Sequence, residues 1–181
     1  MNSAVRHSSS TSLSMELRLL QLEASESIRR LKARYGAFAD AKYTQDYQRQ
    51  PEQTLQEAAW QQTLCFTEDA TWYGGGNFGG DIQGRSALYQ WFQRAPWAWA
   101  AHFYGSPTLE IVDEHQATGQ WRLWQVAQKE DSGQIVMVVG TTEDTYRRDM
   151  DGNWLHHSIR FKELQILALP EGNTSIASAL S

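Results

Sequence analysis

The sequence predicts one α+β domain, with helices first along the chain and an antiparallel sheet after them, so that the helices pack on one face of the sheet. Two observations predict this class. Apolar residues recur at helical spacing before Pro96, and long strand-like runs separated by turn residues follow it. A chain of 181 residues has the size of a single domain. We expect that domain at residues 15–170, between a Ser-rich disordered tail at 1–14 and a flexible tail at 171–181.

Three helices are expected in the first half of the chain. The first spans about 15–43, because apolar side chains recur every three or four residues and mark one face of an amphipathic helix. A polar segment containing Pro51 interrupts this pattern, and two shorter helices are expected at 54–64 and 86–93. The apolar stripe of the first helix consists of Leu20, Ala24, Ile28, Leu31, Tyr35 and Phe38.

Six strand-like runs are expected, because they are rich in β-branched and aromatic residues and are separated by turn residues. The turns at 131–133 and 151–153 have the Asp- and Gly-containing sequences of hairpins. A glycine-rich loop at 74–80 lacks the GK[ST] ending of a phosphate-binding loop. The runs cover residues 69–73, 97–104, 107–113, 117–128, 134–148 and 153–167.

Composition excludes several classes of function. The net charge is −5 and no Lys/Arg run occurs, so a nucleic-acid surface is not expected. No stretch approaches the roughly 18 apolar residues of a membrane span. The single cysteine, Cys65, sits between apolar neighbours and is expected to be a buried thiol in a reducing compartment, which favours the cytoplasm.

The order of several short motifs resembles the SnoaL-like branch of the NTF2-like superfamily. The motifs are residues 31–35 (LKARY) leading into Asp40, residues 66–70 (FTEDA), Gly84-Arg85 before a helix, and His102 shortly before a proline. A Tyr followed five residues later by an Asp, together with a later His, also resembles the bile-acid 7-alpha-dehydratase family. The resemblance covers about residues 16–167.

This resemblance implies a cone-shaped barrel, made of a curved antiparallel sheet wrapped by the N-terminal helices and open at one end. Dehydratases, isomerases, cyclases and dehydrochlorinases use such a fold without a cofactor, usually as homodimers or homotrimers. By position, Asp40 would orient His102 as the general base, with Tyr35 as the hydrogen-bonding acid. The long segment 41–60 and the loop at 74–80 depart from the family and could alter the pocket mouth.

The chemistry of Asp40 and His102 fits that assignment. An imidazole has a pKa suited to abstracting a proton next to a carbonyl, and a carboxylate on its other nitrogen fixes the tautomer. Asp40 also lies near a helix C-terminus, where the dipole disfavours negative charge by about 0.3 to 1 kcal/mol unless something compensates. The alternatives are a solvated Asp40 at a fraying helix end and a His102 that is an ordinary hydrogen-bonded core residue.

Tyr35 and His157 are less clearly functional. Five helical residues turn Asp40 about 140° from Tyr35, so Tyr35 faces the cavity from its flank, or the helix ends early, or Tyr35 is simply core. In the last strand, the apolar face that includes His157 is expected inward, where His157 contacts ligand or makes a structural hydrogen bond.

The aromatic residues make up 12% of the chain and include 8 Trp, which suits a pocket for a hydrophobic substrate as well as a core. Adjacent His156 and His157 point to opposite faces and no HExxH motif occurs, so neither a metal nor another cofactor is expected. The side chains expected to bind substrate are Trp72, Trp99, Phe103, Trp121, Tyr146 and His157.

We therefore expect a cofactor-independent lyase or isomerase, of dehydratase type, acting on a hydrophobic hydroxy-carbonyl or polycyclic compound. Two alternatives are a ligand-binding or assembly module of the same fold without chemistry, and the small subunit of a ring-hydroxylating oxygenase.

Overall fold

The computed structural model describes residues 14–75 and 79–169, which form three helices and one six-stranded sheet. The tails expected at 1–14 and 171–181 lie outside these residues, apart from Ser14, as does the centre of the glycine-rich loop. The helices are α1 (Met15–Asp40), α2 (Glu52–Thr63) and α3 (Arg85–Phe92). The strands are β1 (Phe66–Tyr73), β2 (Asp81–Gln83), β3 (Trp99–Ile111), β4 (Gln116–Gln128), β5 (Ile135–Arg148) and β6 (Trp154–Ala168).

The first helix begins and ends for local reasons. The Ser14 side chain accepts a hydrogen bond from the Leu17 amide and caps the first turn. The helix ends at Asp40 rather than near residue 43, because the chain tightens there into a turn in which the Tyr43 amide donates to the Asp40 carbonyl. None of the described helices is long and apolar enough to cross a membrane.

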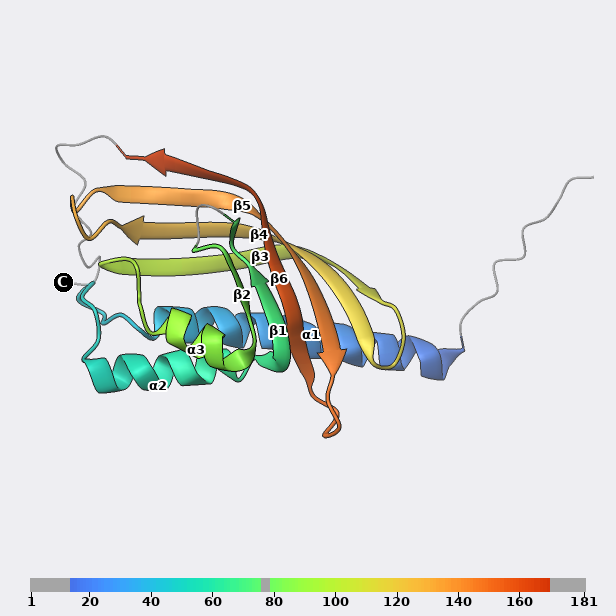
Figure 1. Cartoon of the computed structure of the whole chain (residues 1–181). Helices are drawn as coiled ribbons and strands as arrows, with labels where there is room; N and C mark the ends of the chain where they lie inside the picture. The colour runs from blue at the N-terminus through green and yellow to red at the C-terminus, as the bar shows by residue number, and fades with distance from the viewer. Residues whose placement is uncertain (1–13, 76–78, 170–181) are drawn as a thin grey trace, which may run out of the picture.

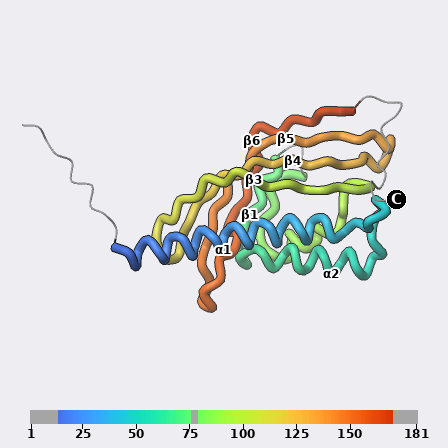
Figure 2. The backbone as a smooth tube through the Cα atoms, turned by 180° about the vertical axis from the view of Figure 1, so that it is seen from behind, coloured from blue at the N-terminus to red at the C-terminus, as the bar shows by residue number. Residues whose placement is uncertain are grey.

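The curved sheet does not close, and one parallel pair of strands makes it mixed where a purely antiparallel sheet was expected. Its strand order is β2-β1-β6-β5-β4-β3. Strands β3 to β6 form the expected antiparallel meander, but β1 pairs parallel with β6. The strands bend strongly, and the three helices lie under one face of the curved sheet (Figures 1 and 2). The α+β class is confirmed, and within residues 14–75 and 79–169 no helix covers the opposite face of β3 to β6.

A bulge joins the two strands expected at 97–104 and 107–113 into the single strand β3. The pairing of β3 with β4 shifts between Gly105 and Thr108, and Ser106 adopts a positive φ of 47°. Pro107 lies in this irregularity, where a residue without an amide proton costs no ladder hydrogen bond. The run of turn-forming residues therefore bends one strand instead of separating two.

A second bulge reverses the inward face at the start of β6. Tyr146 pairs with His156 and Thr145 with Ser158, which leaves His157 as the extra residue. Trp154 and His156 are therefore buried, whereas His157 is only partly buried. The expectation that His157 faces inward is wrong for this reason. Beyond the bulge, Ile159 is buried as expected.

Candidate active site

The Asp40 carboxylate and the His102 imidazole form the central contact of the candidate site. The distance from Asp40 Oδ1 to His102 Nδ1 is 2.7 Å, and the His102 backbone amide donates to both carboxylate oxygens at 3.0 and 3.2 Å. Because an ionised carboxylate only accepts hydrogen bonds, Nδ1 carries the proton of a neutral ring. Nε2 is then the nitrogen able to accept a proton from a ligand.

Asp40 and Tyr35 can both contribute to the candidate site although they lie on different sides of the first helix. Tyr35 lines the cavity from α1, and Asp40, which ends the helix on another side, contacts His102 from its flank. Asp40 is thus not required to face the cavity itself. The two hydrogen-bonding groups of His102 also compensate for the unfavourable position of a carboxylate at a helix C-terminus.

A cavity of about 80 Å³ lies between the helices and the sheet. Its wall includes His102 and Tyr104 from β3, Tyr35 from α1, and Trp72 from β1. Further aromatic rings come from the segment that leads from α3 into β3, including Trp97. This volume is far below the roughly 300 to 1,000 Å³ of pockets for drug-sized ligands, so the cavity suits a small molecule.

Two tyrosines form the wall next to His102. The Tyr104 ring stacks on the His102 ring with a centroid distance of 6.4 Å and an interplanar angle of 7°. The Tyr35 and Tyr104 hydroxyls share a hydrogen bond. Burial raises the pKa of both phenols, so both stay protonated at neutral pH and can donate a proton or a hydrogen bond. The sequence singled out Tyr35 but missed Tyr104, although it shares the inward face of its strand with His102.

Lys42 is a cavity residue that sequence reasoning missed. It is 6% exposed, and its amine lies 5.1 Å from the centroid of the Phe92 ring. Burial lowers the pKa of Lys42 to about 7, although the negative charge of Asp40 opposes the change. Because Lys42 follows the helix end, no periodic pattern in the sequence indicates where its side chain points.

Three buried polar atoms on cavity-lining residues have no hydrogen-bond partner among the residues that the structure describes. They are the Trp72 Nε1 donor, the Gln125 Nε2 donor and the Gln62 Oε1 acceptor. Buried polar groups are nearly always satisfied in native proteins. These atoms could therefore hydrogen-bond a ligand that carries both an acceptor and a donor.

Two of the predicted substrate-binding aromatics belong to a buried polar network instead. The Trp121 indole donates to the Tyr146 hydroxyl at 2.8 Å, and this hydroxyl donates to Asp144 at 2.9 Å. Asp144 also pairs with Lys32 at 2.7 Å, and both of these side chains are fully buried. Trp121 and Tyr146 therefore support the core beside the cavity, rather than line it.

Three other predicted substrate-binding residues lie away from the cavity. Phe103 is 60% exposed on the outer face of β3, because it alternates with His102. Trp99 packs edge-on against Tyr47 at 5.0 Å. His157 lies 3.2 Å from the Thr67 hydroxyl and 3.5 Å from Asp69. Of the six residues, only Trp72 lines the cavity.

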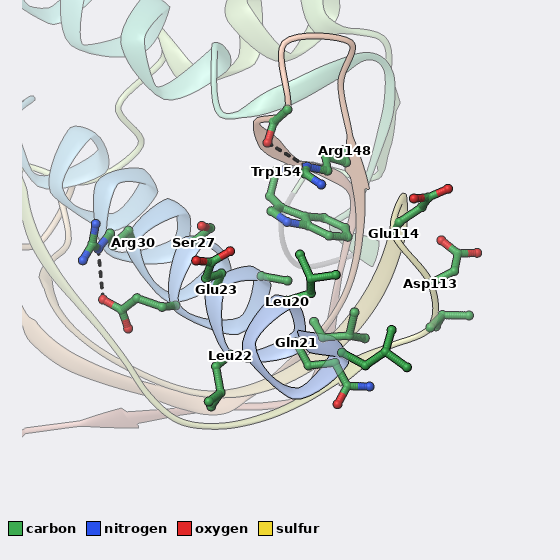
Figure 3. A pocket seen from close by; sticks show the side chains of 16 residues that line it. Leu20, Gln21, Leu22, Glu23, Ser27, Arg30, Asp113, Glu114, Arg148 and Trp154 are labelled. Carbon is green, nitrogen blue, oxygen red and sulfur yellow. Dashed lines mark hydrogen bonds and ion pairs between the residues drawn. The ribbon is translucent and has the colours of Figure 1, made fainter. Parts of the chain in front are cut away.

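A second, larger depression of about 800 Å³ lies between the first half of α1 and the turn from β3 to β4 (Figure 3). Leucines such as Leu20, the indole of Trp154 and several charged side chains line it. Arg148 is held there by the Gly152 carbonyl at 2.9 Å, and Arg30 by Glu26. Its walls contain no histidine or cysteine. Residues 14–75 and 79–169 also contain no cluster of three or more potential metal ligands.

Comparison with known proteins relates the sequence to one domain family. The model of the SnoaL-like domain family matches residues 53–160, which is more than half of the chain and includes His102 but not Asp40. None of the curated proteins compared by sequence matches significantly.

Solved structures extend the likeness to α1. Hexachlorocyclohexane dehydrochlorinase LinA-type3 from Novosphingobium barchaimii LL02 has a TM-score of 0.71 at 15% identity, over 88% of this chain and 99% of that one. A LinA Type2 dehydrochlorinase gives the same score and identity over 97% of its length. A Novosphingobium aromaticivorans protein assigned as a scytalone dehydratase has a TM-score of 0.65 at 16% identity, over 86% of this chain and 98% of that one. These likenesses show a shared cone-shaped fold.

Proposed function

The chain belongs to the SnoaL-like domain family, and we propose that it is a cofactor-independent lyase or isomerase of dehydratase type. The observation that carries this proposal is the 2.7 Å contact between Asp40 and His102 in the wall of a small cavity. Further support comes from the names of the fold relatives, which include dehydrochlorinases and a scytalone dehydratase. We propose that the domain carrying this activity spans residues 15–170.

In the proposed reaction, His102 Nε2 accepts the proton next to the carbonyl of a β-hydroxy compound. Asp40 stabilises the imidazolium that forms, as the carboxylate does in catalytic triads. The electron pair left on carbon forms the new double bond and the bond to the hydroxyl breaks. The departing oxygen takes the proton back from the His102 imidazolium and leaves as water. Tyr35, kept protonated by burial, donates a hydrogen bond to the departing oxygen.

The cavity supports a small hydroxy-carbonyl substrate over a polycyclic one. A volume of about 80 Å³ has no room for fused rings unless the mouth widens. The unpartnered Trp72 and Gln125 donors suit a carbonyl oxygen, and the Gln62 acceptor suits a hydroxyl. The aromatic walls favour a substrate that is apolar apart from its carbonyl and hydroxyl groups.

Conservative substitutions test the role of the pair. We expect His102→Gln and Asp40→Asn each to lower kcat/KM for elimination of water from a small β-hydroxy ketone by about 10²- to 10⁴-fold. His115→Gln is the matched control, because His115 is exposed on the turn before β4. Unchanged activity in either site variant, with its melting temperature intact, would rule out the proposed base.

A ligand-binding module without chemistry is the second candidate, and the same unpartnered polar atoms favour it. It predicts saturable binding of a small hydroxy ketone with no turnover. Calorimetric titration combined with product analysis by mass spectrometry separates the two candidates.

We also propose that the chain forms a homodimer or homotrimer through the outer face of its sheet. Phe103 and Trp124 face each other there across β3 and β4 and are 60% and 58% exposed. Met137 and Leu167 continue this apolar surface in a neighbouring cross-strand row. A cytoplasmic location fits the buried, unpaired thiol of Cys65.

A further inference from the structure

Lys42 is a buried amine in the cavity wall that the elimination chemistry above does not use. It lines the same cavity as His102, and the aromatic face of Phe92 lies 5.1 Å from its amine. Within residues 14–75 and 79–169, no carboxylate lies within ion-pair distance of this amine. Buried lysines usually have such a partner, so its absence requires a physical explanation.

Lys32 provides the contrast within the same molecule. Its side chain is also fully buried, but its amine contacts Asp144 at 2.7 Å and the Thr142 hydroxyl at 3.3 Å. Lys32 does not line the cavity. One buried lysine is thus held in an ion pair, whereas the other faces a space that a ligand can enter.

The surroundings of Lys42 favour the unprotonated form of its amine. Asp40 lies two residues before it, Tyr43 follows it, and His102 and Tyr104 face the shared cavity from β3. Burial lowers the pKa of Lys42 to about 7, so about half of the amine is unprotonated at pH 7. An ordinary lysine is unprotonated at that pH in fewer than about one molecule in a thousand. Desolvation in an apolar pocket is a recognised way to activate a lysine as a nucleophile.

We propose that Lys42 is a nucleophilic amine that forms a reversible imine with a small aldehyde or ketone in the cavity. The nitrogen lone pair forms a bond to the carbonyl carbon, and one amine proton moves to the oxygen, giving a carbinolamine. The carbon–oxygen bond then breaks, the second amine proton leaves with the oxygen as water, and a carbon–nitrogen double bond forms. One water is released and no oxidant or reductant takes part. His102 lines the same cavity and can carry these protons.

Reductive trapping on the full chain tests this site. The protein is incubated with butanal and sodium cyanoborohydride at pH 7, and butylated lysines are located and timed by peptide mass spectrometry. We expect Lys42 to be labelled at least about tenfold faster than Lys129 and Lys162, because much more of its amine is unprotonated. Lys32 should remain unlabelled. Equal or faster labelling of Lys129 and Lys162, with Lys42 unmodified, would overturn the proposal.

Two variants test whether the fast labelling comes from Lys42. Lys42→Arg keeps a cation that cannot form an imine. The fast phase of labelling, which we assign to Lys42, should therefore vanish, while the slow phase from Lys129 and Lys162 persists. Lys129→Arg is the matched control and should keep the fast phase. The wild-type peptide map decides the question even if Lys42→Arg does not fold. The trapping does not depend on elimination activity, so it can succeed or fail independently of the lyase proposal.

Discussion

Asp40 holds His102 through both its ring and its backbone amide, and this double contact distinguishes the pair from a chance ion pair. The sequence indicated both residues through the motif order of the SnoaL-like resemblance, and Asp40 also because a carboxylate at a helix C-terminus needs compensation. It did not indicate Lys42 or Gln125, because neither stands out against its local pattern. Their importance comes from burial beside a cavity, which depends on how distant elements pack.

The titration of Lys42 should change the free energy of unfolding between pH 7 and pH 10. The pKa of Lys42 is about 7 in the folded chain and near the ordinary lysine value of 10.5 in the unfolded chain, so the unfolded chain binds more protons between these values. Stability therefore rises with pH across this window. We expect the free energy of unfolding of wild type relative to Lys42→Met to increase by about 3 kcal/mol from pH 7 to 10.

Urea unfolding at several pH values measures this difference, and Lys129→Met is the control. The window stops at pH 10 because burial raises the pKa of Tyr43 to about 12, so wild type and Lys42→Met both lose stability above that pH as the tyrosine ionises in the unfolded chain. A flat difference between wild type and Lys42→Met would show that Lys42 is solvated, and it would remove the basis for its nucleophilicity.

At the scale of elements, the bulges in β3 and β6 show what the sequence could not predict. Period-two alternation holds for His102 and Tyr104, which share one face of β3, because the pleat is regular there. It failed in β6, where the extra residue His157 shifts the preceding residues to the other face. A bulge depends on the register of the neighbouring strand, which a single run of sequence does not contain.

The bulge in β6 has a measurable consequence, because it buries His156. Burial, together with the charges of Lys32 and Arg34, lowers the pKa of His156 well below 6.5. The unfolded chain therefore binds one more proton as pH falls below 6.5, and stability falls with it. From pH 7 to 5, wild type should lose about 2 kcal/mol more than His156→Phe in urea unfolding.

Phe is a suitable replacement because His156 packs among the rings of Tyr35, Phe66 and Tyr146. His115→Phe, at an exposed site, should show no such difference in acid sensitivity. Equal acid sensitivity of wild type and His156→Phe would mean that His156 is already accessible to protons in the folded chain.

At the scale of the whole molecule, the curved sheet has two faces with different roles. The inner face carries the cavity and is covered by helices, whereas none of the three described helices lies on the outer face of β3 to β6 (Figure 1). Phe103 was expected to bind substrate, because aromatic content alone does not distinguish a pocket from an exposed surface. Its position opposite Trp124 on the outer face supports a role in subunit association instead.

Disrupting this outer surface should lower the molecular mass in solution. We expect wild type to elute as a homodimer or homotrimer in size-exclusion chromatography with light scattering, and Phe103→Glu or Trp124→Glu to shift it toward the monomer, because a buried unpaired charge opposes association. Leu22→Glu is the matched control, since Leu22 is 67% exposed beside the depression of Figure 3. If Leu22→Glu dissociates the protein and Trp124→Glu does not, association uses α1 rather than the sheet.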